Sequence, residues 1–447
     1  MGKQLLSMGL DVGTSTTQLV ISQLSIENKS SGFCVPQMEI TDRNILYKSD
    51  VHFTPLKGHS LVDGEKLRAL VEQEYHSAGI RREQLDTGAV IITGETSRKE
   101  NAQAVLHALS ESAGNFVVAT AGPHLESVLA AKGAGADKLS EERGLSVLHI
   151  DIGGGTSNLA LLKDGQIVAT GCLNVGGRLL KFDEMGAVTY RSPVLSDMPE
   201  FEPGRVPTPE NTALLCQKLV AALEMAARLR PATAHLARFW TEEAGNPWLP
   251  PEKVDVFSFS GGVAACMEQD FPARAFGDIG PELARAIRSS LLCKAEYRVS
   301  TDAIRATVIG AGCHSAQLSG STVFYRGVDL PIKNLPVVHQ LEQLTQEDGP
   351  AVLALAGSEA MSYGRITALA DEIRDRWPAP PVLIAAEADI AKALGHALAL
   401  RMPPDWGILC IDRVKFSQGS YLDVGLPVDT ALPVVVKTLI LSSKEEV

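Results

Sequence analysis

Two short stretches of this chain place an aspartate, glycines and hydroxyl side chains directly after an apolar run. The first begins at Asp11 and the second at Asp151, about 140 residues later. Glycine lets backbone N–H groups approach an anion closely, and carboxylate oxygens are ligands that suit Mg2+. We therefore expect Asp11 and Asp151 to be catalytic residues that hold a magnesium–phosphate group from opposite sides. Such a metal would neutralise charge during phosphoryl transfer.

The residues beside these aspartates predict a nucleotide site. The candidate phosphate-binding residues are the glycines and hydroxyl residues of the two turns: Gly13, Thr14, Ser15 and Thr16 in the first, and Gly153, Gly154, Gly155 and Thr156 in the second. A third glycine turn, at Gly261 and Gly262, follows another apolar run and can approach a nucleoside. Together the three turns predict a site for a nucleotide whose phosphates are held with Mg2+.

Both aspartate turns are expected to lie between strands. After Asp151 come two apolar runs joined by Asp164-Gly165, a strong hairpin signal, and the residues after Asp11 resume an apolar, β-branched pattern. The P-loop pattern G-x-x-x-x-G-K-[ST], which opens a helix, is absent. A single Asp-x-Gly-Thr turn is commonly an ordinary β-turn, but two copies and a third glycine turn favour one shared site.

The elements around these turns alternate between strand and helix, which predicts sheets covered by helices. Glu95 follows a predicted strand at 90–93 and is a candidate third catalytic residue that orients water or magnesium. Helices are expected at 66–78, 101–113, 125–132, 212–228, 281–292 and, with small residues in its middle, around 306–312. Glycines in mid-helix cost about 1 kcal/mol each relative to alanine, so they predict close packing against another element.

We predict three domains, all of the α/β class. The first lobe covers 1–145, and the second covers 146–320 with an inserted proline-rich loop near 182–211. The repeated aspartate motif supports two related lobes. A change of texture near 321 predicts an appended C-terminal α/β domain over 321–447, in which no motif indicates a chemistry.

Composition narrows the class of protein. The chain has 447 residues and a formal charge of −12, which argues against nucleic acid as the main partner. Seven cysteines without a C-x-x-C pair fit a reducing compartment and predict no zinc site. No apolar stretch is long enough for a membrane span, and no signal peptide is evident. We expect a cytoplasmic protein with neither nucleic acid nor membrane as a partner.

Two features of the sequence admit other interpretations. His149 lies within a predicted strand, in which successive side chains point to alternate faces. We therefore expect it to be a packed residue and not a ligand. Aspartic proteases also carry two Asp-Thr/Ser-Gly motifs, one in each lobe. That class fails here because Gly154 stands where a hydroxyl residue should follow the glycine, and because many stretches are helical.

The order of these motifs resembles the actin-like ATPase superfamily, which includes sugar kinases, 70-kDa heat-shock chaperones and actin. Asp11 to Thr17 resembles its first phosphate motif, Asp151 to Ser157 its second, and Ser260-Gly261-Gly262 its adenosine motif. Gly94-Glu95-Thr96 with the following helix is similar to the first connection between lobes, and Ala306 to Gly312 to the second. The resemblance implies two ribonuclease-H-like lobes, with ATP or ADP and Mg2+ as cofactors bound between them.

Nearly the whole chain also resembles the ethanolamine ammonia-lyase reactivating factors of bacterial ethanolamine utilisation. The stretches that carry this resemblance are 4–17 (QLLSMGLDVGTSTT), 116–128 (FVVATAGPHLESV), 149–178, 305–320 (RATVIGAGCHSAQLSG) and 423–427 (DVGLP). The resemblance implies an ATP-dependent chaperone that releases damaged cobalamin from the lyase, so that intact adenosylcobalamin can enter. It also implies work in the cytoplasm in association with a bacterial microcompartment.

Three features leave alternatives open. No Asp-x-His-x-x-Gly cobalt-binding pattern is present, so the residues predict no firm cobalamin ligand. No lysine lies within the first phosphate turn, unlike in the chaperone and actin relatives, which bears on the hydrolysis rate. The same fold class also hosts small-molecule kinases and filament-forming ATPases, and self-association into a homo-oligomer stays open.

Overall fold

The first lobe is a sheet with the strand order β3-β2-β1-β7-β8. Strands β1 (Lys3–Val12), β2 (Thr16–Asn28) and β3 (Met38–Lys48) are antiparallel, while β7 (Thr87–Ile92) and β8 (Val117–Thr120) run parallel to β1. The short β4 (His52–Phe53) pairs with the start of β2. The computed structural model describes residues 3–13, 16–28, 38–57, 61–93, 117–120, 123–241, 253–314, 317–318, 323–345, 349–357, 361–414, 420–425 and 432–438.

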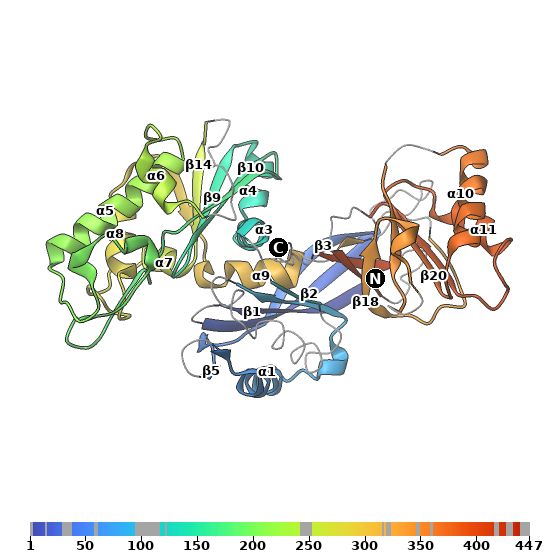
Figure 1. The fold of residues 1–447 in the computed structure, drawn as a ribbon, viewed down its shortest axis with the longest axis horizontal. Helices are drawn as coiled ribbons and strands as arrows, with labels where there is room; N and C mark the ends of the chain where they lie inside the picture. The colour runs from blue at the N-terminus through green and yellow to red at the C-terminus, as the bar shows by residue number, and fades with distance from the viewer. Residues whose placement is uncertain are drawn as a thin grey trace.

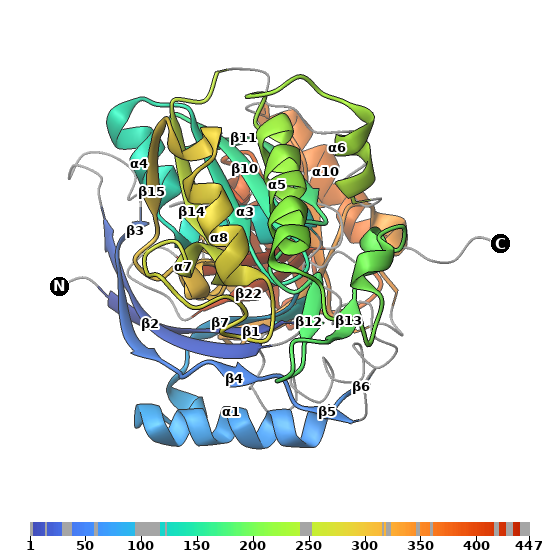
Figure 2. The same cartoon turned by 90° about the vertical axis from the view of Figure 1, so that its left-hand side faces the viewer.

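Helix α1 (Gly64–Ala78) covers one face of this sheet, as Figure 2 shows. Leu67, Val71 and Tyr75 recur at helical spacing, and their side chains are buried against the apolar residues of β1 and β2. The Asp63 side chain caps the first turn, and Gly79 ends the helix with φ 67°. The helix predicted at 66–78 is therefore confirmed, whereas the one predicted at 101–113 lies outside the described residues. A short hairpin, β5 (Leu56–Lys57) and β6 (Leu61–Val62), precedes α1.

The second lobe repeats the same sheet. Its strand order is β11-β10-β9-β14-β15, with β9 (Val147–Ile152), β10 (Ser157–Lys163) and β11 (Gln166–Leu173) antiparallel. Strands β14 (Val256–Ser260) and β15 (Glu296–Val299) run parallel to β9. Two sheets with one topology, each a three-stranded meander extended by parallel strands, confirm the predicted pair of ribonuclease-H-like lobes (Figure 1).

Helices cover the second sheet. They are α5 (Pro209–Ala226), α6 (Ala234–Phe239), α7 (Gly262–Ala265) and α8 (Gly280–Arg288). The proline-rich segment predicted as a loop near 182–211 is more ordered than expected. It contains the end of β12 (Leu180–Phe182), β13 (Val188–Arg191) and two 3-10 turns. Prolines suit the first position of such turns, and Leu195 and Phe201 are buried in the core of the lobe.

Two helices lie between the lobes. Helix α3 (Pro123–Gly133) leads through α4 (Ala136–Arg143) into β9, and α9 (Ala306–His314) follows β15 and packs on both α3 and β1. A Cβ atom on Gly310 would lie 2.0 Å from the carbonyl oxygen of Leu129, and one on Gly9 would lie 2.4 Å from that of Val308. Glycine at these positions therefore permits backbone contact, which confirms the close packing predicted for this helix.

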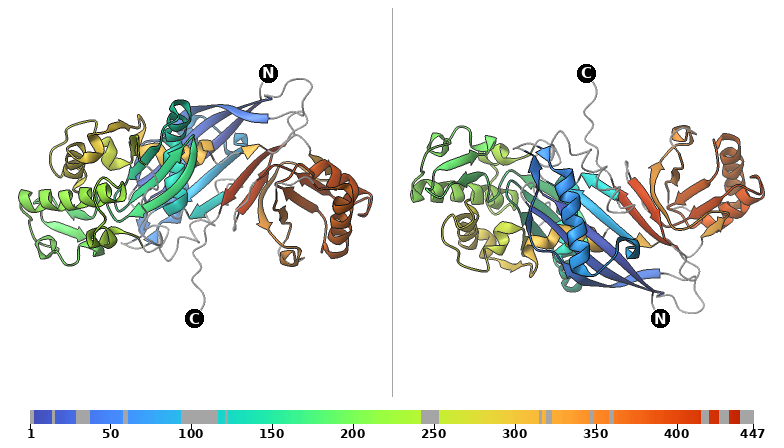
Figure 3. Two further views of the ribbon diagram at one scale, coloured as in Figure 1. Left: turned by 90° about the horizontal axis from the view of Figure 1, so that it is seen from above. Right: turned by 90° about the horizontal axis from the view of Figure 1, so that it is seen from below.

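The C-terminal domain contains an eight-stranded sheet at one end of the molecule (Figure 3). Its strands are β16 (Gln317–Leu318), β17 (Phe324–Arg326), β18 (Ile332–Val338), β19 (Val352–Leu355), β20 (Val382–Ala386), β21 (Ile408–Ile411), β22 (Ser420–Val424) and β23 (Pro433–Thr438). Strand β16 pairs with β23, so this sheet includes residues that precede the predicted boundary at 321.

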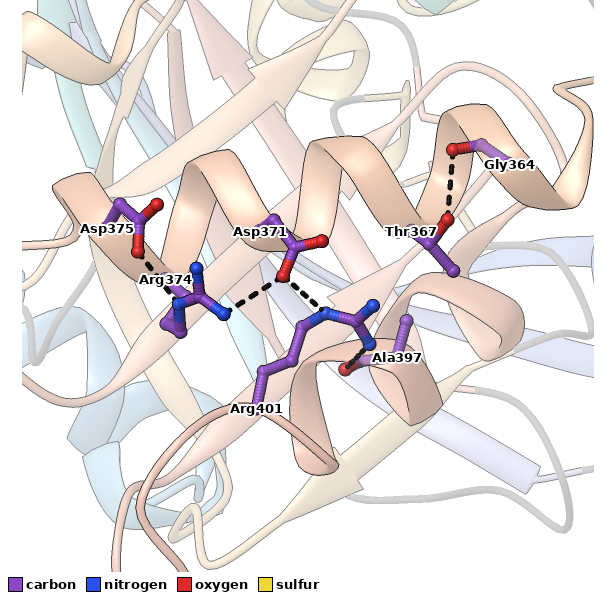
Figure 4. A network of polar contacts seen from close by, with 7 residues as sticks. All are labelled: Gly364, Thr367, Asp371, Arg374, Asp375, Ala397 and Arg401. Atoms are coloured by element: carbon purple, nitrogen blue, oxygen red, sulfur yellow. Dashed lines mark hydrogen bonds and ion pairs between the residues drawn. The ribbon is translucent and has the colours of Figure 1, made fainter.

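Helices α10 (Tyr363–Arg376) and α11 (Ala391–Ala399) pack on the parallel strands of this sheet. Figure 4 shows how polar contacts join them: the Asp371 carboxylate accepts hydrogen bonds from Arg374 and from Arg401, which follows α11. These alternating strands and helices agree with the α/β class predicted for this part of the chain. Within the described residues, no helix is both long and apolar enough to cross a membrane.

Candidate functional site

Asp11 and Asp151 occupy equivalent places, near the carboxyl ends of β1 and β9. Each lies on the strand between an antiparallel hairpin partner and a parallel neighbour. Burial raises the pKa of Asp11 to about 7; the hydroxyl of Thr93, which donates to Asp11 Oδ1 at 2.8 Å, opposes this, and the charge of Asp151 adds to it. The charge of Asp151 thus acts on the pKa of Asp11, which links the two predicted carboxylates electrostatically.

Asp151 is held by residues from two other elements. Burial raises the pKa of this carboxyl to about 6, while hydrogen bonds from Ser260 and Thr307 lower it. Ser260 ends β14 and is the parallel neighbour of Asp151, and its hydroxyl donates to Asp151 Oδ1. Thr307 belongs to α9, the helix between the lobes. One carboxylate of the site is thus attached both to its own sheet and to the interlobe helix.

The first phosphate turn is closed by a hydrogen bond from Gly13 N to Thr16 O at 2.9 Å. The Thr54 hydroxyl donates to Gly13 O at 2.8 Å and also contacts the hydroxyl of Thr17 at 3.1 Å. Thr54 therefore fixes this turn from the segment after β4, a role for which its sequence context held no signal. Thr14 and Ser15 lie outside the described residues, so their phosphate contacts stay predictions.

The second phosphate turn has the same closure, from Gly153 N to Thr156 O at 2.9 Å. The chain at 176–178 supports it: Gly177 N donates to Gly153 O at 3.0 Å and Arg178 N donates to Gly154 O at 2.6 Å. A Cβ on Gly155 would meet no atom within 4 Å. The turn is therefore held on one side and open on the other, as a turn that binds an anion through backbone N–H groups must be.

The third glycine turn lies against the end of β9. Gly261 has φ 91°, and a Cβ there would lie 2.3 Å from the carbonyl oxygen of Ile152, so only glycine fits this position. Gly261 N donates to Ala303 O at 2.7 Å, and Gly262 begins α7 with open space where its Cβ would be. This predicted nucleoside turn thus adjoins the strand that carries Asp151.

Two buried amides complete the site, and sequence reasoning missed both. Gln18 is the cross-strand partner of Asp11, and Asn158 is that of Asp151, so each amide shares a sheet face with one carboxylate. Gln18 Nε2 donates to Ile304 O at 3.3 Å, and Asn158 Nδ2 donates to Glu126 Oε2 at 2.8 Å. The signal was present in the sequence, because each amide follows its aspartate by seven residues.

The amide oxygens bear on whether the site suits a hydrated cation. Gln18 Oε1 and Asn158 Oδ1 are buried, and neither has a hydrogen-bond partner in the part of the chain that the structure describes. A buried acceptor is normally satisfied by protein or bound water. Amide and carboxylate oxygens are what the waters around Mg2+ need as acceptors, so the residues present fit a hydrated Mg2+. Among the described residues, no group of three or more His, Cys, Asp or Glu side chains could hold a metal.

A third carboxylate lies at the junction of the lobes. Glu126 belongs to α3, is 8% exposed, and accepts the hydrogen bond from Asn158. This position was not predicted from the sequence. Glu95, the predicted third catalytic residue, and the segment proposed as the first connection lie outside the described residues, so both stay predictions. In the described part of the chain, α3 is the helix that pairs with α9 between the lobes.

Comparison with known proteins identifies close relatives over the whole chain. A family model described as ethanolamine utilisation protein EutA matches residues 3–442. A protein of Escherichia coli (strain K12) named ethanolamine ammonia-lyase reactivase EutA is 39% identical over 471 aligned positions, which cover 99% of each chain. The protein of the same name from Salmonella typhimurium (strain LT2) is 38% identical over 475 positions, again with 99% of each chain covered.

Solved structures show a more distant similarity. An Aquifex aeolicus member of the Ppx/GppA family aligns with 69% of this chain and 97% of its own, at 13% identity and a TM-score of 0.43. The ethanolamine utilization protein EutJ from Carboxydothermus hydrogenoformans aligns with 69% of this chain and 89% of its own, at 18% identity and a TM-score of 0.34.

Proposed function

The chain belongs to the EutA family of ethanolamine utilisation proteins, and from this premise we propose that it is an ATP-dependent reactivating chaperone of ethanolamine ammonia-lyase. The observation that carries the ATP dependence is the convergence of Asp11 and Asp151, one from each lobe, with each carboxylate beside a buried amide oxygen. Its relatives are named reactivases of that lyase, which supports the choice of partner.

Each part of the site has a role in this proposal. Asp11, Asp151, Gln18 and Asn158 would accept hydrogen bonds from water around Mg2+, and the two glycine turns that begin at Gly13 and Gly153 would hold the phosphates. The turn at Gly261 and Gly262 receives the nucleoside. Mg2+, when bound, neutralises charge on the transferring phosphoryl group. Glu126, next to Asn158, is positioned to orient the attacking water.

Nucleotide binding would act on the partner through the position of the lobes. The site takes residues from both lobes, and α9 carries both a ligand-orienting residue, Thr307, and the backbone contact with β1. A nucleotide that binds the closed arrangement better than the open one shifts the population toward closure. We propose that this closure distorts the cofactor pocket of the lyase, so that damaged cobalamin leaves and intact adenosylcobalamin enters.

The test is a reactivation assay with the full chain. Inactivated lyase is mixed with ATP, Mg2+, free adenosylcobalamin and this protein, and ammonia release from ethanolamine is followed. We expect activity to return with the wild-type protein, and not with Asp151→Asn or when ATP is omitted. If the wild-type protein restores no activity under these conditions, the proposed function is wrong.

A small-molecule kinase is the second candidate, because Glu126 supplies a buried carboxylate at the lobe junction that can serve as a base. The same preparation can be incubated with labelled ATP and a panel of small alcohols and sugars. Transfer of the γ-phosphate to an acceptor would favour the kinase, whereas release of phosphate alone favours the chaperone.

A further inference from the structure

We infer that His149 is a positioning residue for Asp151, which it orients through Ser260; this inference rests on the proposed nucleotide site. His149 lies on β9, two residues before Asp151, and is fully buried, so its ring cannot touch a nucleotide. Both ring nitrogens contact serines of the parallel strand β14. Nδ1 lies 3.0 Å from Ser258 Oγ, and Nε2 lies 2.9 Å from Ser260 Oγ.

The direction of these hydrogen bonds follows from the carboxylate at the end of the chain of contacts. Ser260 has one hydroxyl proton and donates it to Asp151, which as a carboxylate can only accept. Ser260 must therefore accept from His149, which assigns the proton of the ring to Nε2. The ring is fully buried between two neutral serine hydroxyls, so it is neutral, and its Nδ1 accepts from the Ser258 hydroxyl.

The result is one ordered sequence of donors: Ser258 to His149, His149 to Ser260, and Ser260 to Asp151. The last of these hydrogen bonds holds Asp151 Oδ1 toward Ser260 of β14. The carboxylate is thereby oriented before any ligand arrives, as supporting residues orient the ligands of a metal. Without the Nε2–H donor, the Ser260 hydroxyl is free to rotate and to donate elsewhere, for example to a nearby backbone carbonyl.

Two matched substitutions separate this role from simple packing. In His149→Gln the side-chain amide nitrogen can take the place of Nε2 and still donate to Ser260, whereas in His149→Asn the shorter amide reaches only toward Ser258. The measurement is the Kd of ATP by calorimetry, once with Mg2+ and once with EDTA. We expect His149→Asn to weaken ATP binding with Mg2+ about tenfold. This is the effect of losing one hydrogen bond to a charged group, here the bond from Ser260 to Asp151. Binding in EDTA should be unchanged, and His149→Gln should restore binding to near the wild-type value.

Ser260→Ala provides the control along the same sequence of contacts. It should weaken binding with Mg2+ at least as much as His149→Asn, and the double variant should be no weaker than Ser260→Ala alone, because both changes remove one effect. Equal losses with Mg2+ and with EDTA, or a Gln variant that behaves like the Asn variant, would show a merely structural role and overturn the inference.

A spectroscopic measurement on the wild-type protein makes the inference independent of the Asn variant's folding. In protein labelled with 15N-histidine, the His149 ring should be the Nε2–H tautomer, and an Nδ1–H tautomer would overturn the inference. If the wild-type protein shows no Mg2+-dependent ATP binding at all, the nucleotide site itself is wrong and the inference falls with it. Normal ATP binding by both His149→Asn and Ser260→Ala would leave the site intact and reject only the role of His149.

Discussion

Replacing Asp11 with asparagine should stabilise the nucleotide-free protein and at the same time abolish Mg2+-dependent nucleotide binding. Asparagine has the shape of aspartate and can still accept the hydrogen bond from Thr93, but it carries no charge. In protein kept free of Mg2+ by EDTA, the ionised Asp11 is partly buried, and the charge of Asp151 acts on it. Removing this charge therefore relieves part of the free-energy cost of burying it.

The sign and size of the effect follow from the shift in pKa. Burial raises the pKa of Asp11 from 3.8 to about 7, so the folded state binds this proton more tightly than the unfolded state. Asp11 therefore reduces the free energy of unfolding as the pH rises from about 4 through 7. The full shift in pKa corresponds to a loss of about 4 kcal/mol in the free energy of unfolding at pH 8. Because the side chain is partly exposed to solvent, we expect a loss of about 2–4 kcal/mol.

The assay is urea and thermal unfolding of wild type and Asp11→Asn in EDTA at pH 5 and pH 8. Asp11→Asn should be more stable than the wild type at both pH values. Its gain in the free energy of unfolding should be larger at pH 8 than at pH 5, by on the order of 2 kcal/mol. Adding ATP and Mg2+ should then stabilise the wild type and leave the variant unchanged. Asp151→Asn is the matched control and should show a smaller gain, because its pKa is raised only to about 6.

A gain in stability that does not depend on pH would contradict the assignment of this effect to Asp11 ionisation. An Asp11→Asn protein that is less stable than wild type at pH 8 would contradict the burial of a charged pair. If the variant still bound ATP with unaltered Mg2+ dependence, Asp11 would not belong to the metal site.

Three further outcomes are expected. Gly310→Ala should lower the free energy of unfolding by more than about 2 kcal/mol, because the new Cβ would lie 2.0 Å from Leu129 O. Urea unfolding measures this loss, and an unchanged midpoint would contradict the backbone contact between α9 and α3. Thr54→Val should weaken ATP binding about fivefold, because Gly13 O loses a hydrogen bond that contributes about 1 kcal/mol. If calorimetry gave the wild-type Kd, Thr54 would not hold the turn. Lys48→Met should change the free energy of unfolding by less than about 1 kcal/mol, because the ion pair of Lys48 with Asp302 is substantially exposed. A larger loss, or a loss that high salt does not reduce, would show a coupled contact between the lobes.

The residues predicted from the sequence are those whose signal is local. Asp11, Asp151 and the glycine turns each follow an apolar run within a few residues, and the charge of Asp151 acts on the pKa of Asp11. The repeated strand order also follows from local hairpin signals, because the motif and its flanking runs occur twice. His149 was expected to be packed, and it is fully buried.

The residues that could not be predicted act across long stretches of chain. Thr54 contacts Gly13 from 41 residues away, and Ser260 contacts Asp151 from 109 residues away. Such partners are set by which strands become neighbours in the sheet, and a single sequence does not encode that neighbourhood locally. Gln18 and Asn158 are different: the turn length puts each opposite its aspartate, so their common offset of seven residues was available but not used.

The short connection after α9 ties the C-terminal domain to the helix that carries Thr307, a hydrogen-bond partner of Asp151. Only two residues separate His314, the last residue of α9, from Gln317, which begins β16 of the eight-stranded sheet. So few residues cannot absorb a large displacement, since each spans at most about 3.6 Å. A displacement of α9 must therefore move β16 as well, and with it the edge of the sheet at which β16 pairs with β23.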